Sequence, residues 1–462
     1  MDDSNQTLDE ECRRSTFFQW PVRIFGPVPG LMELNLACWG LFVGFVAVPL
    51  FVRLWIQFKS KGGITNILPI DFIYFYGIGR LTNEYPLTRL YDYSLQLKIF
   101  NDIYPLHDAD YGPSPYPPWV ALFFGLFARI PFAQAYLLWM GTSLILYLIG
   151  IAVLIKGVFP GKRLEISLVF CFALAFHPFV MNTLANGQLA SIAVFSVGLA
   201  IFQERRSNPF CSGLALSILT YKPTLLLLII PMLLLTRRLR TLLGFITGAV
   251  VLILVATTSG GIQIWPAYAH FLNYFGKAAG LGGQSVLLSW KYVDFSSLSY
   301  AVPGGRSREG LVALVFVTIM IAGWLVMLLW KSSTGIRPAQ CLTWAATLTW
   351  TMLLNVYVPI YDSVLVTIAL ILTIGALRDL DWRAAEGWIV ALAALIFGVS
   401  WVTTSIAKAY GIQSLTILLS VFGLVQLFQL RRAIRQGSPQ EERTRRASAS
   451  KACRGLGDTT TL

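Results

Sequence analysis

The chain contains few charged residues for its length. Of its 462 residues, 13% are acidic or basic and 56% are apolar, whereas a soluble domain typically has about 25% charged residues. Most of the molecular surface must therefore face lipid. A soluble domain is also missing, because the longest polar stretch, residues 59–118, is interrupted by aromatic clusters.

Several motifs of soluble enzymes are absent. The sequence has no Walker-type GxxxxGK[ST] segment and no room for a Rossmann-like domain, which disfavours a nucleotide-linked donor. The six cysteines form no CxxC pair, and the three histidines are too far apart in sequence for a helical metal motif. We therefore expect no disulfide framework, no metal site and no cofactor.

Basic residues outnumber acidic ones and give a net charge of +13. They lie in short links and in the tail from Arg431 to Arg454, a distribution that is typical of cytoplasmic segments. Membrane orientation and attraction to anionic membrane lipids explain this charge better than nucleic-acid binding does. The polar N-terminus carries no apolar stretch with a cleavage site, so we expect the first span to be retained.

Long apolar runs recur along almost the whole chain. A hydrocarbon core of about 30 Å requires about 20 helical residues, and the runs predict an all-α, polytopic integral membrane protein with about twelve transmembrane helices. A cytoplasmic segment (1–33) precedes the transmembrane domain (34–430), and a basic, disordered cytoplasmic tail (431–462) follows it. The predicted spans are Leu34 to Phe58, Trp119 to Phe132, Tyr136 to Ile155, Leu164 to Val180, Leu189 to Phe202, Ser212 to Leu235, Thr241 to Thr258, Leu311 to Trp330, Cys341 to Val358, Ser363 to Leu377, Trp388 to Thr404 and Ile412 to Leu430.

Two connections are long, residues 59–118 and 259–310, and the basic links place both on the external side of the cytoplasmic (inner) membrane. Two basic links, Lys156 to Arg163 and Glu204 to Arg206, also fall outside under twelve alternating crossings, which conflicts with this orientation. A pair of short helices that dips in and out around Lys222-Pro223 would remove part of the conflict. The side on which residues 186–188 lie is therefore open.

The first external loop opens with an aspartate among apolar residues, in the segment Pro69-Ile70-Asp71-Phe72-Ile73. Partial desolvation raises the basicity of such a carboxylate, which suits a general base that removes a proton from a hydroxyl. Aspartate is also a favoured helix N-cap. The alternative is therefore a structural role for Asp71 as a cap of the helix that follows.

The same loop is rich in tyrosines and acids. Eight of the eighteen tyrosines lie between Tyr74 and Tyr116, where they can anchor the chain at the membrane surface or stack on sugars. Tyr91 and Asp92 are candidate substrate contacts. Asp108-Ala109-Asp110 has the form of the DxD motif of nucleotide-sugar transferases, but two acids without a supporting domain do not predict a metal site.

Polar residues inside the apolar segments form a second set of candidates. Ionisable groups in a membrane are costly unless they are paired or face a polar cavity. Because Pro223 breaks the helix after Lys222, the lysine can face such a cavity and neutralise a phosphate, or it can extend to the nearer interface instead. The other candidates are Asn186, Gln188, His177, Tyr361 and Asp362.

The order of these motifs resembles glycosyltransferase family 87, the membrane mannosyltransferases of the GT-C fold that use polyprenyl phosphate sugars. The resemblance runs from about residue 65 to about residue 380. The matching segments are Asp71-Phe72, Leu90-Tyr91-Asp92, Pro115-Tyr116-Pro117-Pro118, Asn186-Gly187-Gln188, Gly213 through Lys222-Pro223 and Pro359-Ile360-Tyr361-Asp362.

This resemblance implies transfer of a sugar, with mannose expected, from a polyprenyl-phosphate donor to a lipid or glycan hydroxyl on the external face. It implies that Asp71 is the catalytic base, that Lys222 lies near the lipid phosphate, and that polar residues such as Gln188 and Asp362 line the cavity. One carboxylate is sufficient for a single displacement with inversion, whereas a glycosidase needs two. Phe72, in place of a second acid, disfavours a protein O-mannosyltransferase.

Two other classes are alternatives. A twelve-span transporter or flippase predicts polar residues near the bilayer midplane and an internal repeat, but the second half of the sequence has no counterpart of the long loop 59–118. A non-catalytic membrane scaffold would leave the acids of that loop unexplained.

Overall fold

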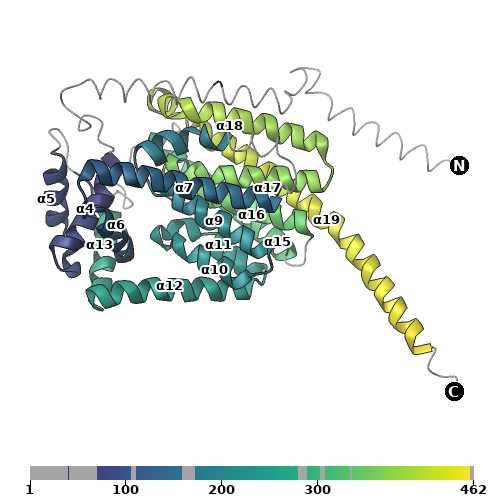
Figure 1. The fold of residues 1–462 in the computed structure, drawn as a ribbon. Coiled ribbons are helices and arrows are strands. Elements are labelled where there is room, and N and C mark those ends of the chain that lie inside the picture. Colours follow the sequence, from purple (N-terminus) through teal and green to yellow (C-terminus); the bar gives the residue numbers. More distant parts are fainter. Residues whose placement is uncertain are drawn as a thin grey trace.

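The chain folds into a bundle of long helices that lie side by side (Figure 1). A computed structural model describes residue 40 and residues 70–105, 111–158, 172–278, 289–301, 307–332, 336–356 and 358–457. These residues are helical or irregular, with one isolated bridge between Tyr292 and Pro359, and this confirms the all-α class for them. The first predicted span, Leu34 to Phe58, and the motif at Asp108 lie outside the described residues.

Short helices from the two long connections cover one end of the bundle. Aromatic rings hold them together: the ring of Phe72 packs on Phe124, with 6.3 Å between centroids, and Phe124 packs on Trp139 at 5.0 Å. We call this end the Asp71 end. The helices of the long connections are α4 (Ile70–Glu84), η3 (Leu87–Arg89), α5 (Tyr93–Ile103), α13 (Ile264–Ala278), η7 (Ser289–Lys291) and α14 (Phe295–Ala301). The helix α6 (Pro118–Phe127) begins where the first connection ends and packs against α4.

The helices of the bundle differ in how much of their surface the protein buries. Of the most apolar stretch of each helix, 89% is buried in the span formed by η9 and α17 but only 11% in α15. The first therefore lies at the centre, and the second offers its side chains to lipid. The bundle consists of α7 (Phe132–Val158), η4 (Pro178–Ala185), α9 (Ala190–Arg205), α10 (Pro209–Ser217), η5 (Ile218–Tyr221), η6 (Pro223–Leu226), α11 (Ile229–Leu235), α12 (Leu239–Gly260), α15 (Arg308–Lys331), α16 (Arg337–Leu353), η9 (Ile360–Val364), α17 (Leu365–Asp379), α18 (Arg383–Tyr410) and α19 (Ser414–Gly457).

Six described helices are long and apolar enough to cross a membrane, or up to seven if the bent pair η4 and α9 is one broken span. The twelve-span arrangement stays a prediction. Two of the predicted spans have another form in the structure: Trp119 to Phe132 contains the ten-residue helix α6, and Ser212 to Leu235 is divided at Lys222-Pro223. Apolar length alone did not distinguish these segments from full crossings.

The segment from α10 to α11 enters the bundle and returns. α10 and α12 run parallel, because Gly213 lies against Thr241 and Gly244, while Ser217, one turn further on, lies against Gly248. A side-chain carbon at Gly213 would lie 1.9 Å from the Thr241 carbonyl oxygen, so these helices approach closely only because glycine lacks one. Two parallel helices require that the chain between them runs back, and it reverses at Lys222.

The helices α7 and α9 are parallel as well. The hydroxyl oxygens of Ser143 and Ser191 lie 2.7 Å apart, and further along both helices Arg205 donates to the carbonyl oxygen of Gly157. The links after α7 and after α9 therefore lie at the same end of the bundle. The parallel pairs explain why simple alternation of crossings fails for this sequence.

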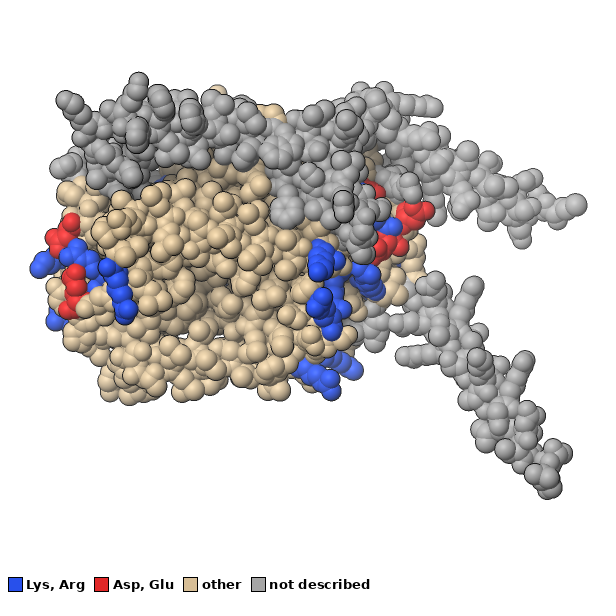
Figure 2. Space-filling model, in the orientation of Figure 1, with Lys and Arg blue, Asp and Glu red and all other residues tan. Residues whose placement is uncertain are grey.

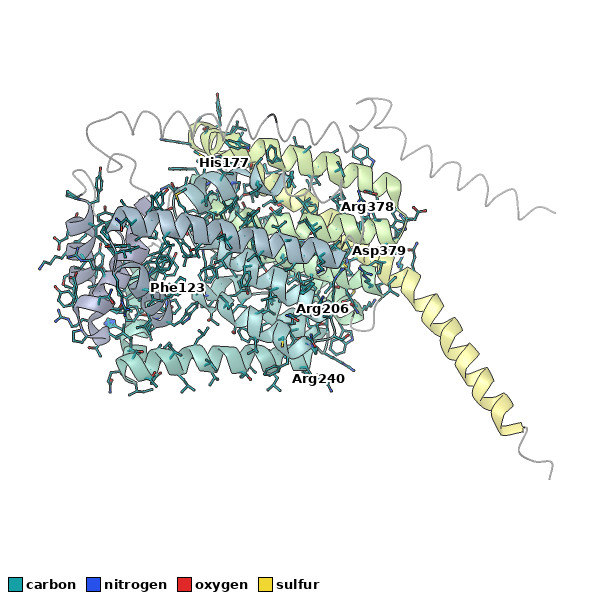
Figure 3. The ribbon with its side chains drawn as sticks, in the orientation of Figure 1. Phe123, His177, Arg206, Arg240, Arg378 and Asp379 are labelled. Carbon is teal, nitrogen blue, oxygen red and sulfur yellow. The ribbon has the colours of Figure 1, made fainter. Side chains whose placement is uncertain are left out.

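Basic links gather at the end of the bundle opposite Asp71. Figure 3 shows Arg206, Arg240 and Arg378 there and Phe123 at the other end, and Figure 2 shows a broad uncharged surface between the two charged ends. The conflict that alternating crossings left open for Glu204 to Arg206 does not arise in the structure, because Glu204 pairs with Arg238 at this same end. We call this end the basic end; it includes Lys156, Arg205, Arg206, Arg238, Arg240, Arg337 and Arg378.

The last helix extends well past the bundle (Figure 1). The final predicted span ends at Leu430, but α19 continues as a helix to Gly457. The disorder of the tail stays a prediction; the described part of its backbone, up to Gly457, is helical. Arginine, glutamate, glutamine and alanine, which are frequent in residues 431–453, all have high helix propensity.

Candidate active site

Asp71 lies in the first turn of α4, one residue after the helix begins. Its neighbours Phe72 and Ile73 are fully buried, whereas Asp71 itself is partly exposed. Burial raises the pKa of the Asp71 carboxyl, and two smaller effects oppose this: a hydrogen bond from the side chain of Gln188 and the positive charge of Lys291. The group is thus a carboxylate of raised basicity with one neutral and one cationic neighbour.

A tight turn at Asn186-Gly187-Gln188 places Gln188 beside Asp71. Gly187 has a φ of +73°, and a side-chain carbon there would lie 2.7 Å from Cβ of Phe72, so only glycine fits this conformation without strain. Two side chains of α7 fix the turn: Trp139 donates to the Gly187 carbonyl oxygen at 2.9 Å, and Tyr136 donates to that of Ala185 at 2.7 Å. The turn is therefore a rigid support for the amide of Gln188.

Lys222 and Asp362 form a buried ion pair. Lys222 lies at the break between η5 and η6, and Asp362 lies in the short helix η9, directly before α17. The Lys222 ammonium also lies 4.9 Å from the centre of the Tyr361 ring. Because η4 packs against η9, the Gln188 turn, which follows η4, and this ion pair belong to neighbouring parts of one region.

Three polar atoms of this region are buried without a hydrogen-bond partner among the described residues: Oε1 of Gln188, the hydroxyl of Tyr221 and Oγ1 of Thr224. Buried polar groups in native proteins nearly always have partners. A polar ligand bound in this region would supply the missing hydrogen bonds.

The second long connection also reaches the site. Asp294, fully buried before α14, accepts hydrogen bonds from the backbone N–H groups of Ser297 at 2.8 Å and of Val358 at 3.0 Å. The N–H of Val293 donates to the Val358 carbonyl oxygen at 2.9 Å. These bonds fasten the chain next to Lys291 onto the segment that leads into η9, so they tie the cation near Asp71 to the element that carries Asp362.

Sequence reasoning missed Asp294 and Lys291. The segment Asp294-Phe295-Ser296-Ser297 has the form of a helix N-cap, and the hydroxyl of Ser296 also donates to the Asp294 carboxylate at 2.5 Å. This local signal predicts a cap. It does not predict the bond to Val358, because that partner lies far along the chain.

Asp92 and Tyr91, two of the other predicted site residues, make contacts that stabilise the fold. Asp92 caps α5: it accepts hydrogen bonds from Ser94 at 2.6 Å and Arg89 at 2.8 Å, and these bonds lower the pKa of its carboxyl. Tyr91 donates to the Tyr116 carbonyl oxygen at 2.9 Å and packs on Tyr268. Both therefore have evident structural tasks.

Asn186 and Tyr361 both lie next to the central groups. Asn186 ends η4 directly before Gly187, and the ring of Tyr361 faces Lys222. His177, which precedes η4, packs edge to face on Trp401. Within the described residues, no group of three His, Cys, Asp or Glu side chains is arranged to hold a metal ion.

Comparison with known proteins gives one match. The family model described as "Glycosyltransferase family 87" matches residues 115–359, more than half of the chain. The matched region contains Gln188, Lys222 and Lys291, whereas Asp71 and Asp362 lie outside it. No curated protein sequence and no solved structure matches the chain.

Proposed function

The chain belongs to glycosyltransferase family 87, and from this membership we propose that it moves mannose from a polyprenyl-phosphate donor to an acceptor hydroxyl on the external side of the membrane. The acceptor is a lipid or a glycan. The reaction is a single displacement that inverts the anomeric carbon. The observation that carries this proposal is the partly shielded Asp71 carboxylate, which Gln188 supports beside a region of unpaired buried polar atoms.

Asp71 acts as the general base in this proposal. A base works best when its pKa approaches the operating pH, and burial shifts the pKa of Asp71 in that direction. The carboxylate takes the proton of the acceptor hydroxyl as the oxygen attacks the anomeric carbon. The bond from that carbon to the phosphate oxygen breaks, and the electron pair leaves with the polyprenyl phosphate.

Cations stabilise the phosphate that departs. Lys291 is close enough to Asp71 for its positive charge to lower the pKa of the Asp71 carboxyl. Lys222 lies in the adjoining region with Tyr361. Fixed positive charge acts strongly on a leaving anion in a site that excludes water. In the free protein Asp362 neutralises Lys222, so the donor phosphate would share or replace this carboxylate as the partner of the lysine.

The support from the fold is the position of the basic end. Basic links are typical of the cytoplasmic side, and Lys156, Arg206 and Arg378 lie opposite the Asp71 end. The Asp71 end then faces outward. An external site is served by lipid-linked sugars, because the nucleotide-linked donors of the cytoplasm do not reach it.

The experiment that tests this assignment compares Asp71→Asn with Asp92→Asn. Membranes that contain each variant receive radiolabelled polyprenyl phosphate mannose and extracted lipid, and label in the product is counted. Loss of a general base typically lowers the rate by about 10²–10⁴-fold, so we expect Asp71→Asn to lose transfer. Asp92→Asn should keep it, because asparagine caps helices as well as aspartate does. Undiminished transfer by Asp71→Asn would refute the role of Asp71.

A further inference from the structure

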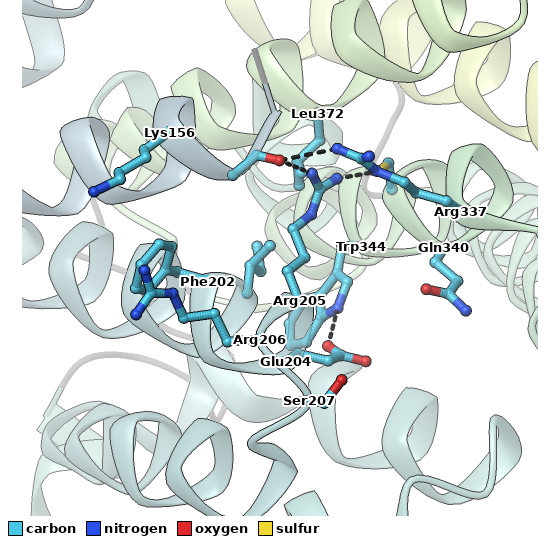
Figure 4. Close-up of a pocket in the computed structure, with 13 residues that line it drawn as sticks. Lys156, Phe202, Glu204, Arg205, Arg206, Ser207, Arg337, Gln340, Trp344 and Leu372 are labelled. Carbon is cyan, nitrogen blue, oxygen red and sulfur yellow. Dashed lines mark hydrogen bonds between the residues drawn. The ribbon is translucent and has the colours of Figure 1, made fainter. Parts of the chain in front are cut away.

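The basic end contains a cavity that the proposed reaction does not use. It has a volume of about 530 Å³ and lies where the last turns of α7 and α9 meet the first turn of α16 (Figure 4). Volumes of about 300–1,000 Å³ are usual for sites that bind small molecules. Four cationic side chains and one acidic side chain line it: Lys156, Arg205, Arg206, Arg337 and Glu204.

Glu204, the one acidic residue among the described residues of this lining, already has partners. Glu204 pairs with Arg238 and accepts a hydrogen bond from the indole N–H of Trp344 at 2.8 Å. Among the described residues, no carboxylate forms an ion pair with Lys156, Arg205 or Arg206. Within the part of the chain that the structure describes, the cavity therefore carries more positive than negative charge.

Arg337 pairs with Asp379 at 3.7 Å, and neutral groups hold the cations of the lining as well. Arg205 and Arg337 reach the same carbonyl oxygen, that of Gly157 (Figure 4), and Arg205 also contacts Sγ of Cys341 at 2.6 Å. The guanidinium of Arg206 lies 4.7 Å from the centre of the Phe202 ring. Guanidinium groups offer paired donors that match the oxygens of a phosphate. An anion between these groups would relieve the repulsion between the fixed charges.

The depth of the cavity in the membrane follows from the tryptophans around it. Trp330, Trp344 and Trp382 each face an arginine, at 5.7 Å from Arg237, 5.8 Å from Arg238 and 4.3 Å from Arg432. Tryptophan is enriched at the level of the lipid headgroups. Trp330, at the same end of the bundle as the cavity, is largely exposed on the surface, which supports a cavity near the level of the headgroup phosphates.

We propose that this cavity binds the headgroup phosphate of an anionic phospholipid from the leaflet at the basic end. Basic pockets between transmembrane helices are suited to anionic headgroups. The lining also has an apolar part, of which Phe202 is partly exposed and offers a surface for the glycerol and the first acyl carbons. A free phosphate ion would gain nothing from this apolar wall, which favours the lipid as the occupant.

The test uses two double variants that remove the same charge. Lys156→Gln/Arg206→Gln removes two exposed cations of the cavity, and Arg240→Gln/Lys331→Gln removes two exposed cations outside it. Purified protein is titrated with phosphatidylglycerol or phosphatidylcholine in nanodiscs or detergent, and bound lipid is measured by native mass spectrometry. Because sugar transfer is not the readout, the result is independent of the proposed function.

We expect wild type to prefer phosphatidylglycerol over phosphatidylcholine. Each cation near an anionic headgroup contributes about a fivefold increase in affinity, so the cavity variant should bind phosphatidylglycerol about 25-fold more weakly, and the outer variant should bind it as wild type does. Equal loss in the two variants would overturn the proposal. Full displacement of the lipid by inorganic phosphate alone would overturn the choice of a lipid as the occupant.

Discussion

The two ends of the bundle differ in their most buried and their most exposed charges. Near Asp71, Lys222 pairs with the buried Asp362, and Asp294 accepts bonds from two backbone N–H groups. At the basic end some charges are paired as well, Glu204 with Arg238 and Arg378 with Glu386, but Lys156 and Arg206 are exposed and have no carboxylate partner in the described part of the chain. Buried matched charges fix the geometry of a site, whereas unmatched exposed charges orient the protein and attract anionic lipid.

This contrast predicts that the buried Lys222–Asp362 pair and an exposed pair at the basic end contribute very differently to the free energy of unfolding. Removing one partner of a buried pair costs about 3–5 kcal/mol, so we expect Asp362→Leu to lower the free energy of unfolding by that amount. The exposed pair of Arg337 and Asp379, separated by 3.7 Å, is the control, and Asp379→Asn should cost at most about 1 kcal/mol. Thermal or denaturant unfolding in detergent measures both. Similar losses in the two variants would remove the distinction between the ends.

The double variant Lys222→Met/Asp362→Leu separates stability from function. Replacing both partners of a buried pair by apolar residues is often neutral or stabilising, so the double variant should unfold near the wild-type midpoint. Sugar transfer should still be lost, because no cation is left at position 222 to meet the donor phosphate. Wild-type transfer by a stable double variant would show that the pair serves the fold alone.

A smaller effect is expected at the turn that supports Asp71. Gly187→Ala forces a left-handed backbone on alanine, at a cost of about 1–2 kcal/mol, and brings its Cβ to 2.7 Å from Cβ of Phe72. Both stability and transfer should fall. Gly141→Ala in α7, where nothing lies within 4 Å, should instead be neutral or slightly stabilising. If the two alanine variants behave alike, the turn is not the rigid support described above.

The smallest expected effect is a shift in the pH dependence of transfer. The hydrogen bond from Gln188 and the charge of Lys291 both favour the ionised form of Asp71 and lower its pKa. Removing either one raises that pKa further, so more alkaline conditions are needed to ionise the base. The acidic limb of the kcat/KM profile should move to higher pH in Gln188→Leu and in Lys291→Gln, and it should stay in place in Arg240→Gln. An unmoved limb in both site variants would mean that the limb does not report Asp71.

Much of the candidate site could be predicted because polar residues stand out in an apolar sequence. Asp71, Gln188, Lys222 and Asp362 were all selected in this way, and the structure brings them into one region. The ion pair itself was not predicted, since Lys222 and Asp362 are 140 positions apart in the chain and no local pattern links them. Asp92 stood out equally, although its neighbours explain its position as a cap.

The fold was predictable in class but not in path. Apolar length correctly located the long helices, but it does not indicate in which direction each helix runs. Ordinary alternating crossings were therefore expected for the parallel helices α10 and α12 and for the short helix α6. The one local signal of a reversal was Lys222-Pro223, a charge and a helix breaker inside an apolar run. The approach of Gly213 to Thr241, which reveals the direction, is a contact between helices that the sequence does not specify.

The identity of the donor and the stereochemistry of transfer test the central claim most directly. Wild-type membranes receive either polyprenyl phosphate mannose or a nucleotide-linked mannose, with synthesis of the lipid-linked donor blocked, and the anomeric configuration of the product is determined. The account predicts label only from the polyprenyl donor and an inverted anomeric carbon. Direct transfer from the nucleotide sugar, or retention of configuration, would contradict it.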